Sequence, residues 1–512
     1  MFHLRHGPLA ALSTLVLTAV CSGQGTFDLD KGPPAGTLGA ALRLNITNAP
    51  TGLVLLFPSL SAGPTPVSIV DPSDPRSLNI GLDLATNLVI LVANPFGQTF
   101  TTLPLPGDPT FNGTIMHWQA VTLGTSSLVG DISNNVVSQL GTPGTNLLAP
   151  ATLGAARSFS AILDLPNGDA LITGGGGGTL TSASGLATTE RWNFRTMSRQ
   201  PGPNMTTSRA LHDAVQLADG RWLLIGGANS AGGVLSSCEI YDPSTNSFSP
   251  TGSMGTPRIL HASTRLFDGR VLVVGGTNTL VDVTSTISGT LRSAEVYNPA
   301  SGTWSGTADI GGYRLAPALT TLSNGVAMVS GGVEVSFFFG FPTGATSTTN
   351  VQFYSPGSNN WSGGPGMNQG RAGHHYNQVT MSGGRVLMTG GVNVTGLLTA
   401  QNAGPTASAE YYTVGGGWTG STMPQARSLH TATVLQNGNV AICGGAQGTL
   451  LAPTAINNVN LYNPASNSWS NQPGLVTPKS GHAAYVQPDG LLVLFGGQGA
   501  TTTSNSISTL HY

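Results

Sequence analysis

Charged residues are scarce in this sequence of 512 residues. They make up 8% of the chain, against about 25% in ordinary globular proteins. Only two lysines occur, Lys31 and Lys479, and the formal net charge is −2. Without a basic stripe to neutralise a phosphate backbone, we expect no binding to nucleic acid. The surface must be solvated mainly by the hydroxyl and amide groups of Ser, Thr and Asn.

Cysteines are also few. Of the three, Cys21 lies in the N-terminal region, and Cys238 and Cys443 fall in units of the chain that are far apart. This spacing predicts no disulfide framework, and we expect Cys238 and Cys443 to be small buried apolar residues.

Long apolar segments are absent after the N-terminal region, so we expect no transmembrane segment. Residues 1–23 have the pattern of a secretory signal, with Arg5 at the start and an apolar run over 9–20 that is too short to span a bilayer. The residues before Cys21 match a lipidation signal poorly. The sequence therefore predicts a secreted or cell-surface protein.

A repeated pattern occupies the C-terminal two-thirds of the chain. Each of seven units begins with a basic residue, and these starts are 49 to 57 residues apart. The starts are Arg157, Arg209, Arg258, Arg314, Arg371, Arg427 and Lys479. In six units an Asn-Gly or Asp-Gly pair follows, as at 167–168, and favours a tight hairpin turn. An apolar run that ends in Gly-Gly comes next, as at 271–276, and predicts a strand covered on both faces.

Aromatic residues mark two further strands in most units. The first set consists of Trp192, Tyr241, Tyr297, Tyr354, Tyr412 and Tyr462. The second set consists of Phe248, Trp304, Trp361, Trp418 and Trp469. Each unit is therefore expected to be a four-stranded antiparallel meander, which can bury both faces only when copies stack around a ring.

The Gly-Gly pair, the spaced Tyr and Trp residues and the period near fifty residues resemble the kelch family. The resemblance covers about residues 146–512 and implies an all-β fold, with a seven-bladed kelch-type β-propeller. Because the seventh unit stops at Tyr512, before a fourth strand, we expect residues 146–152 to close the last blade. In that prediction Leu147 and Leu148 pack inward.

Residues 24–145 lack the repeat. Short alternating segments at 42–46, 53–57 and 88–92, separated by Pro, Gly, Asn and Asp, predict a small β-sandwich module. The stretch 103–141 resembles a short module of large secreted bacterial proteins, a resemblance that implies no activity.

Two further series of titratable residues recur in the units. Glutamates precede the first aromatic of a unit at Glu190, Glu239, Glu295 and Glu410. Histidines follow the basic residue at His212, His261, His374, His430 and His482. Residues repeated in every blade usually belong to the scaffold, and a buried charge needs a partner. We therefore interpret the Arg and Glu residues as buried ion pairs and the histidines as core residues. The alternative is an open ring of Arg and His around a central pocket.

Function is better sought where the repeat is broken. Units three to five carry the longest segments between Gly-Gly and the next aromatic. In unit four Pro317 replaces the histidine, and the segment 333–341 contains four phenylalanines. We predict a binding site on this rim. Its candidate residues are Tyr313, Arg314, Phe337, Phe338, Phe339, Phe341 and His375. The alternative is that the phenylalanines are covered by neighbouring loops or by the N-terminal module.

These patterns favour a binding or surface-interaction scaffold for a glycan, a polymer or a protein. It would use no cofactor or metal, and we expect binding rather than catalysis. The alternative is a copper radical oxidase resembling galactose oxidase or glyoxal oxidase, whose central domain is also a kelch propeller behind a β-sandwich. A kelch-type sugar mutarotase is a weaker third candidate.

The oxidase resemblance would imply a mononuclear copper with two Tyr and two His, one Tyr being cross-linked to Cys. A further domain after the propeller would supply one ligand. This sequence ends within the seventh unit, and neither Cys238 nor Cys443 lies in a recognisable copy of the copper motif. We therefore expect no such site.

Overall fold

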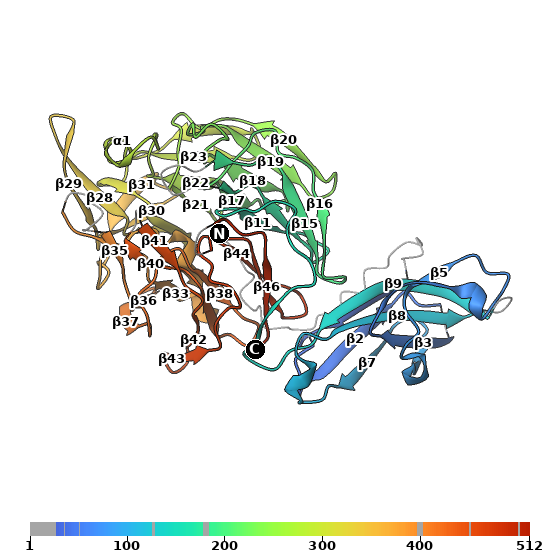
Figure 1. Cartoon of the computed structure of the whole chain (residues 1–512). Helices are drawn as coiled ribbons and strands as arrows, with labels where there is room; N and C mark the ends of the chain where they lie inside the picture. Colours follow the sequence, from blue (N-terminus) through green and yellow to red (C-terminus); the bar gives the residue numbers. More distant parts are fainter. Residues whose placement is uncertain are drawn as a thin grey trace.

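The computed structural model describes residues 27–34, 36–50, 52–124, 128–177, 184–396, 403–449, 452–499 and 502–512. The predicted signal segment and Cys21 lie outside the described residues. The protein is all-β, with many four-stranded antiparallel sheets arranged as propeller blades and a separate N-terminal group of strands (Figure 1). Within the described ranges, no helix is both long and apolar enough to cross a membrane.

The N-terminal strands form two sheets that face one another. One sheet has the order β1 (Asp28–Gly32), β2 (Ala41–Thr47), β7 (Thr99–Pro104), and the other has the order β6 (Val89–Ala93), β3 (Gly52–Ser59), β8 (Ile115–Leu123), β9 (Val129–Gln139). The remaining elements are the hairpin β4 (Ala62–Pro66) and β5 (Ser77–Ile80) and the short helices η1 (Val67–Ile69), η2 (Ala85–Asn87) and η3 (Pro109–Phe111). Leu42 and Leu44 of one sheet pack with Val54 and Leu56 of the other in one buried core. The alternating leucines of the sequence therefore each bury one face of a strand.

The described part of the repeat region contains seven four-stranded sheets, which we number as blades one to seven. Their strands, from innermost to outermost, are β11 (Ala161–Asp164), β12 (Ala170–Thr173), β15 (Thr189–Asn193) and β16 (Ser198–Pro201) in blade one; β17 (Asp213–Gln216), β18 (Trp222–Ile225), β19 (Cys238–Asp242) and β20 (Ser247–Thr251) in blade two; β21 (Ala262–Arg265), β22 (Val271–Val274), β23 (Ala294–Asn298) and β24 (Thr303–Gly306) in blade three; β26 (Ala318–Thr321), β27 (Ala327–Ser330), β30 (Val351–Ser355) and β31 (Asn360–Gly363) in blade four; β32 (Gln378–Thr380), β33 (Val386–Thr389), β36 (Ser408–Thr413) and β37 (Gly417–Thr422) in blade five; β38 (Thr431–Val434), β39 (Val440–Cys443), β42 (Val459–Asn463) and β43 (Ser468–Gln472) in blade six; and β44 (Ala483–Val486), β45 (Leu492–Phe495), β46 (Ile507–Leu510) and β10 (Asn146–Leu148) in blade seven. Short helices flank β32, namely η4 (His375–Asn377) and η5 (Ser382–Gly384).

Backbone hydrogen bonds join each blade to the next. The second glycine of each Gly-Gly pair donates its N–H to the carbonyl of the basic residue that begins the following blade, over 2.7 to 3.1 Å. The donors are Gly175, Gly227, Gly276, Gly332, Gly391, Gly445 and Gly497, and the acceptors are Arg209, Arg258, Arg314, Arg371, Arg427, Lys479 and Arg157 in the same order. The last of these bonds links blade seven back to blade one.

Glycine is required at these pairs because the backbone there is left-handed and closely approached. Gly226 has φ +55°, and a Cβ on it would lie 2.5 Å from the carbonyl oxygen of Arg258. Only a residue without a side chain can take this conformation at this distance. The Gly-Gly pair of the sequence is therefore the joint between blades.

Blade seven takes its outermost strand from upstream of the repeats. Strand β10 pairs antiparallel with β46, with Asn146 opposite Leu510 and Leu148 opposite Ser508. The expected inward packing of Leu148 is wrong, because its side chain is 46% exposed. Asn146, two residues earlier on the same face of the strand, is the buried residue, and its amide donates to the Pro473 carbonyl over 2.5 Å. Leu147, on the opposite face, is half-buried.

Buried contacts join the N-terminal module to the propeller. The Lys31 ammonium lies 2.9 Å from an Asp489 carboxylate oxygen, and both side chains are buried. Lys31 also donates to the Val137 carbonyl over 2.9 Å. Val137, near the end of β9, packs in one core with Ile162 and Trp192 of blade one. Figure 1 shows the module lying beside this part of the ring, near the chain's C-terminus.

Candidate functional site

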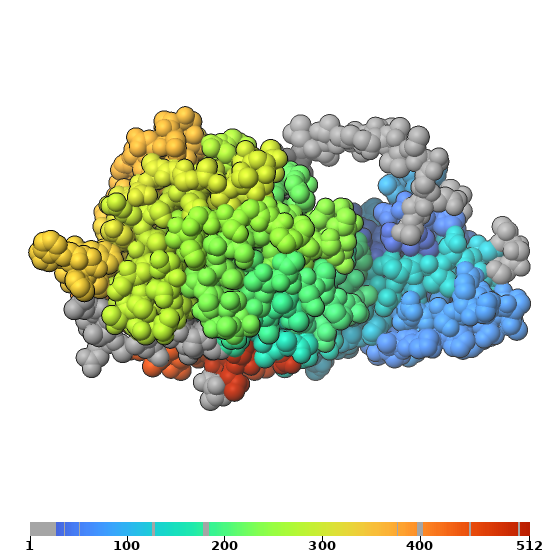
Figure 2. All heavy atoms as spheres, turned by 90° about the horizontal axis from the view of Figure 1, so that it is seen from above, coloured from blue at the N-terminus to red at the C-terminus, as the bar shows by residue number. Residues whose placement is uncertain are grey.

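Blade four carries a small sheet of its own on the predicted rim. The segment that leads into the blade forms β25 (Tyr313–Leu315), which pairs with β28 (Val333–Phe338), and β28 pairs with β29 (Phe341–Ser347). The long segments of other blades form α1 (Val283–Ser288) in blade three, β34 (Val392–Val394) and β35 (Ala403–Pro405) in blade five, β40 (Ala446–Thr449) and β41 (Ala452–Ala455) in blade six, and β13 (Gly176–Gly177) and β14 (Ser184–Gly185) in blade one. Figures 1 and 2 show the β28–β29 hairpin, in yellow to orange, projecting from the ring.

Three phenylalanines stand at the tip of this hairpin. Phe338 is paired with Phe341, and Phe339 and Gly340 between them have φ +49° and +83°. Two central residues with positive φ form the tight turn that suits a right-twisted hairpin. The side chains of Phe338, Phe339 and Phe341 are 66%, 87% and 74% exposed. Among the described residues, neither the neighbouring loops nor the N-terminal module covers them.

The base of the hairpin is packed. The ring of Phe337 lies 4.6 Å from that of Tyr313, and the guanidinium of Arg292 lies 5.4 Å from the centre of the Tyr313 ring. Val333 and Val335 are buried in a core that also contains residues of α1 and of blade five. The hairpin is thus fixed at its root, and Tyr313 and Phe337 belong to that root rather than to the exposed tip.

Arg314 and His375 do not share this surface. The Arg314 side chain is buried, donates to the Asn350 carbonyl over 3.0 Å, and has its pKa lowered by burial. His375 is buried at the centre of the ring, with Nε2 3.0 Å from an Asp213 carboxylate oxygen. Of the seven candidate residues, the structure therefore brings together only the two aromatic residues at the root and the three at the tip.

The Asp213–His375 pair closes the middle of the ring and was missed by the sequence reasoning. Asp213 belongs to blade two, and it also accepts from the Ser263 amide and hydroxyl of blade three. Burial alone would raise the pKa of Asp213, but the charge and hydrogen bond of His375 hold it below the usual value. The sequence did contain a signal. The position after the series histidine carries Asp213 and His375 in blades two and five, where the other blades have Ala161, Ala262, Ala318, Thr431 and Ala483.

The series histidines are buried core residues, as predicted, and the structure places them between blades. Four of them hydrogen-bond through Nε2 to a hydroxyl of the preceding blade, over 2.8 to 3.2 Å. These pairs are His212 with Thr173, His374 with Ser330, His430 with Thr389 and His482 with Thr431. Burial lowers the pKa of His212 and of His482 to about 3, so both rings are neutral at ordinary pH. They do not form a cationic ring around an open pocket.

The predicted buried ion pairs are confirmed. The pairs are Arg157 with Glu190 at 2.6 Å, Arg209 with Glu239 at 3.0 Å, Arg258 with Glu295 at 2.8 Å and Arg371 with Glu410 at 2.8 Å, and all eight residues are buried. Blades four, six and seven have Gln352, Asn460 and Ser508 where the others have Glu. Arg427 is hydrogen-bonded to Asn460 instead, and burial lowers the pKa of Arg427 to about 10.

Lys479 of blade seven is a buried cation without a carboxylate. Its ammonium donates to the Gly496 carbonyl over 3.2 Å and to the Ser506 hydroxyl over 2.6 Å. In the described part of the chain, no acidic side chain lies within ion-pair distance of it. Burial lowers the pKa of Lys479 from 10.5 to about 7.

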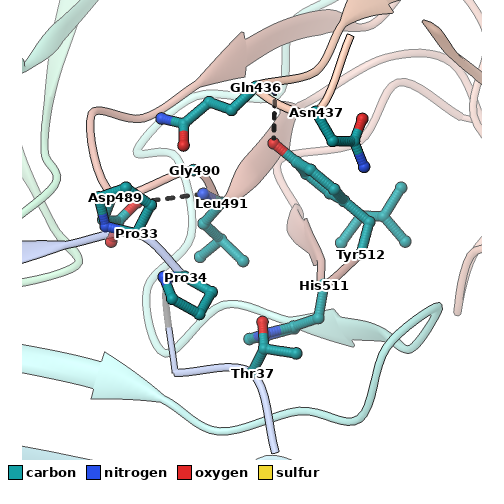
Figure 3. Close-up of a pocket in the computed structure, with 11 residues that line it drawn as sticks. Pro33, Pro34, Thr37, Gln436, Asn437, Asp489, Gly490, Leu491, His511 and Tyr512 are labelled. Atoms are coloured by element: carbon teal, nitrogen blue, oxygen red, sulfur yellow. Dashed lines mark hydrogen bonds between the residues drawn. The ribbon is translucent and has the colours of Figure 1, made fainter. Parts of the chain in front are cut away.

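A pocket of about 280 Å³ lies where the N-terminal module meets blades six and seven (Figure 3). Pro33, Pro34 and Thr37 line it from the module, and Gln436, Asp489 and Tyr512 are among the residues that line it from the propeller. The carboxylate of Asp489 in this pocket is already paired with Lys31. The pocket is formed by other elements than the predicted rim and contains none of the candidate residues.

Comparison with known proteins gives a motif and a fold. Residues 259–309 match the kelch motif. The chain contains a kelch-repeat propeller. A fungal alcohol oxidase of the AA5 family, solved in complex with copper, superposes on it with a TM-score of 0.54 and 16% sequence identity, over 71% of this chain and 75% of that chain. At this identity the likeness concerns the fold. No curated protein matches the sequence significantly.

The copper in that fungal enzyme raises the question of whether this kelch propeller could hold a metal. Within the described ranges, no group of three or more His, Cys, Asp or Glu side chains is placed to bind one. Cys238 and Cys443 are buried in blade cores, as predicted, and burial raises their pKa to about 11 and about 12. Both therefore stay protonated thiols. These residues do not fit a mononuclear copper site with a cross-linked cysteine.

The low pKa of Lys479 predicts a pH-dependent stability of the propeller. Between pH 7 and 10.5 the folded protein binds fewer protons at this site than the unfolded chain. The free energy of unfolding should therefore rise between pH 7.5 and 8.5, by up to about 1.4 kcal/mol per pH unit. Urea unfolding of the wild type and of Lys479→Met at these pH values tests this. We expect the variant to lose that part of the slope, and equal slopes in both proteins would contradict it.

Proposed function

We propose that this kelch propeller is an exported interaction scaffold. In this proposal the seven blades close into one seven-bladed ring over residues 146–512, behind a β-sandwich-like module at 24–145. The ring holds the β28–β29 hairpin rigidly, and the hairpin tip makes the contact with a partner. The protein is exported by its N-terminal signal to the cell surface or the medium.

The exposed hairpin tip is the observation that supports this proposal. A phenylalanine side chain gains about 1.5–3 kcal/mol when it is fully covered. Three such rings are exposed within four residues on a hairpin whose root is packed. Contiguous exposed apolar surface of this kind is typical of interaction sites. The sequence patterns favoured a glycan, a polymer or a protein as the partner, but the proposed function requires only a partner that takes up phenyl rings.

Replacing Phe338 and Phe339 together by Ser should abolish partner capture without unfolding the protein. Both rings are exposed, so the melting temperature should stay close to that of the wild type. The loss of two apolar contacts should weaken capture by at least about 100-fold. Wild type and variant are compared for retention on a glycan array and on intact cells of the source organism.

Phe267→Ser is the matched control for this experiment. Phe267 is also exposed, but it lies in the turn between β21 and β22, on the opposite rim of the ring from the hairpin. Its loss should change neither stability nor capture. A hairpin variant that melts at a much lower temperature yet is captured like the wild type would sink the proposal.

An oxidase is the second candidate, because the AA5 fungal enzyme shares the fold. The donor residues described above argue against it. Metal analysis and absorption spectra of protein expressed with copper separate the two functions. Stoichiometric copper with a radical absorption band would favour the oxidase, and the scaffold proposal expects neither.

A further inference from the structure

The hairpin tip carries no charge that a partner would have to neutralise. From 335 to 370 the sequence contains no Asp, Glu, Lys, Arg or His. Glu334, at the root of β28, accepts a hydrogen bond from the Asn350 amide over 2.9 Å. Everything beyond it toward the tip is apolar or neutral. Burying the tip in an apolar medium therefore requires no desolvation of a charged group.

The turn at the tip holds a phenylalanine in a conformation that disfavours it. Phe339 has φ +49°, where side chains other than Gly, Asn and Asp are strained. In the turns between the outer two strands, left-handed positions are held by Asn246, Asn359 and Asn467 in blades two, four and six, and by Met197 in blade one. An Asn at 339 would relieve the strain and still close the turn. Apolar residues elsewhere in the chain, such as Leu211 and Leu260, also have positive φ, but Phe339 differs from them in that its ring is exposed at the outermost point of the hairpin.

The shape of the tip limits what can cover it. Figure 2 shows the hairpin as a narrow convex projection at the edge of the molecule. A stable protein–protein contact buries roughly 800 Å² on each partner, whereas a phenylalanine supplies about 150–250 Å² when it is fully buried. Three partly exposed rings on a narrow projection fall short of such an interface. Their area is instead sufficient for a small apolar group that inserts into the interfacial layer of a membrane.

We propose that the partner of this scaffold is a lipid surface, an inference that rests on the proposed function. The tip of the β28–β29 hairpin inserts Phe338, Phe339 and Phe341 into the interfacial layer of a phospholipid bilayer. The antiparallel pairing of β28 with β29 continues, after a register shift at Ser336–Phe337, to Phe338 and Phe341, so the backbone groups that face the partner strand pair within the hairpin. Because the tip is uncharged, binding does not depend on anionic lipids or on low salt.

Vesicles of pure phosphatidylcholine test this proposal. The full-length exported protein is floated with the vesicles at low salt and at about 1 M NaCl, where exposed charges are screened. We expect the same bound fraction at both salt concentrations. In the Phe338→Ser, Phe339→Ser double variant we expect at least about a 100-fold loss of binding, while Phe267→Ser binds like the wild type. Phe339→Trp should keep binding and shift its emission to the blue when vesicles are added.

Each other outcome overturns the lipid proposal in a distinct way. Binding that disappears at high salt would show electrostatic adsorption, and equal binding of the double variant would show that the hairpin is not the anchor. If the wild type does not bind vesicles but the double variant loses retention on the glycan array or on protease-sensitive sites of cells, the lipid proposal is wrong and the proposed scaffold function stands. If the double variant matches the wild type in all these experiments, both proposals fail.

Discussion

The rest of the structure depends on the hydrogen bonds made by the buried basic residue at the start of each blade. Its carbonyl accepts the N–H of the second glycine from the preceding blade, as in the pair Gly227 and Arg258. In six blades its side chain donates to the first glycine of its own blade, as Arg258 does to Gly275 over 3.1 Å. A buried guanidinium is stable only with a partner, and Glu295 supplies it. One residue thus joins two blades and anchors the turn between them.

Because the repeated residues hold the blades together, a functional site has to be sought elsewhere in the blades. The repeated Arg, Glu and His side chains are committed to joints between strands and blades, and Asp213 with His375 occupies the ring centre. Arg, Glu, His and Asp are common in active sites, but here their side chains bind to one another and to the backbone within the scaffold. The segments after Gly-Gly do not join blades in this way, so they can vary in length and structure. In blade four this freedom is used for a projecting hairpin with three exposed phenylalanines.

Features that recur in several units could be predicted from the sequence, whereas features that depend on a single contact could not. The blades, the Arg–Glu pairs and the buried cysteines followed from patterns repeated several times. The tip of the hairpin was visible only as four phenylalanines, because its turn is Phe339–Gly340 rather than the Asn-Gly or Asp-Gly pair that marks other hairpins. The contact of Asp213 with His375 joins residues 162 positions apart. Leu148 was misplaced because a strand of three residues gives no alternation to read.

Unfolding of Glu295→Ala tests most directly whether buried ion pairs hold the ring together. Removal of this carboxylate leaves the Arg258 guanidinium buried without a counter-charge, which should lower the free energy of unfolding by roughly 3–5 kcal/mol. Asp309→Ala, which removes the partly exposed partner of Arg292, should lower it by no more than about 1 kcal/mol. A loss for Glu295→Ala as small as that of the surface control would contradict a ring held by its buried cations.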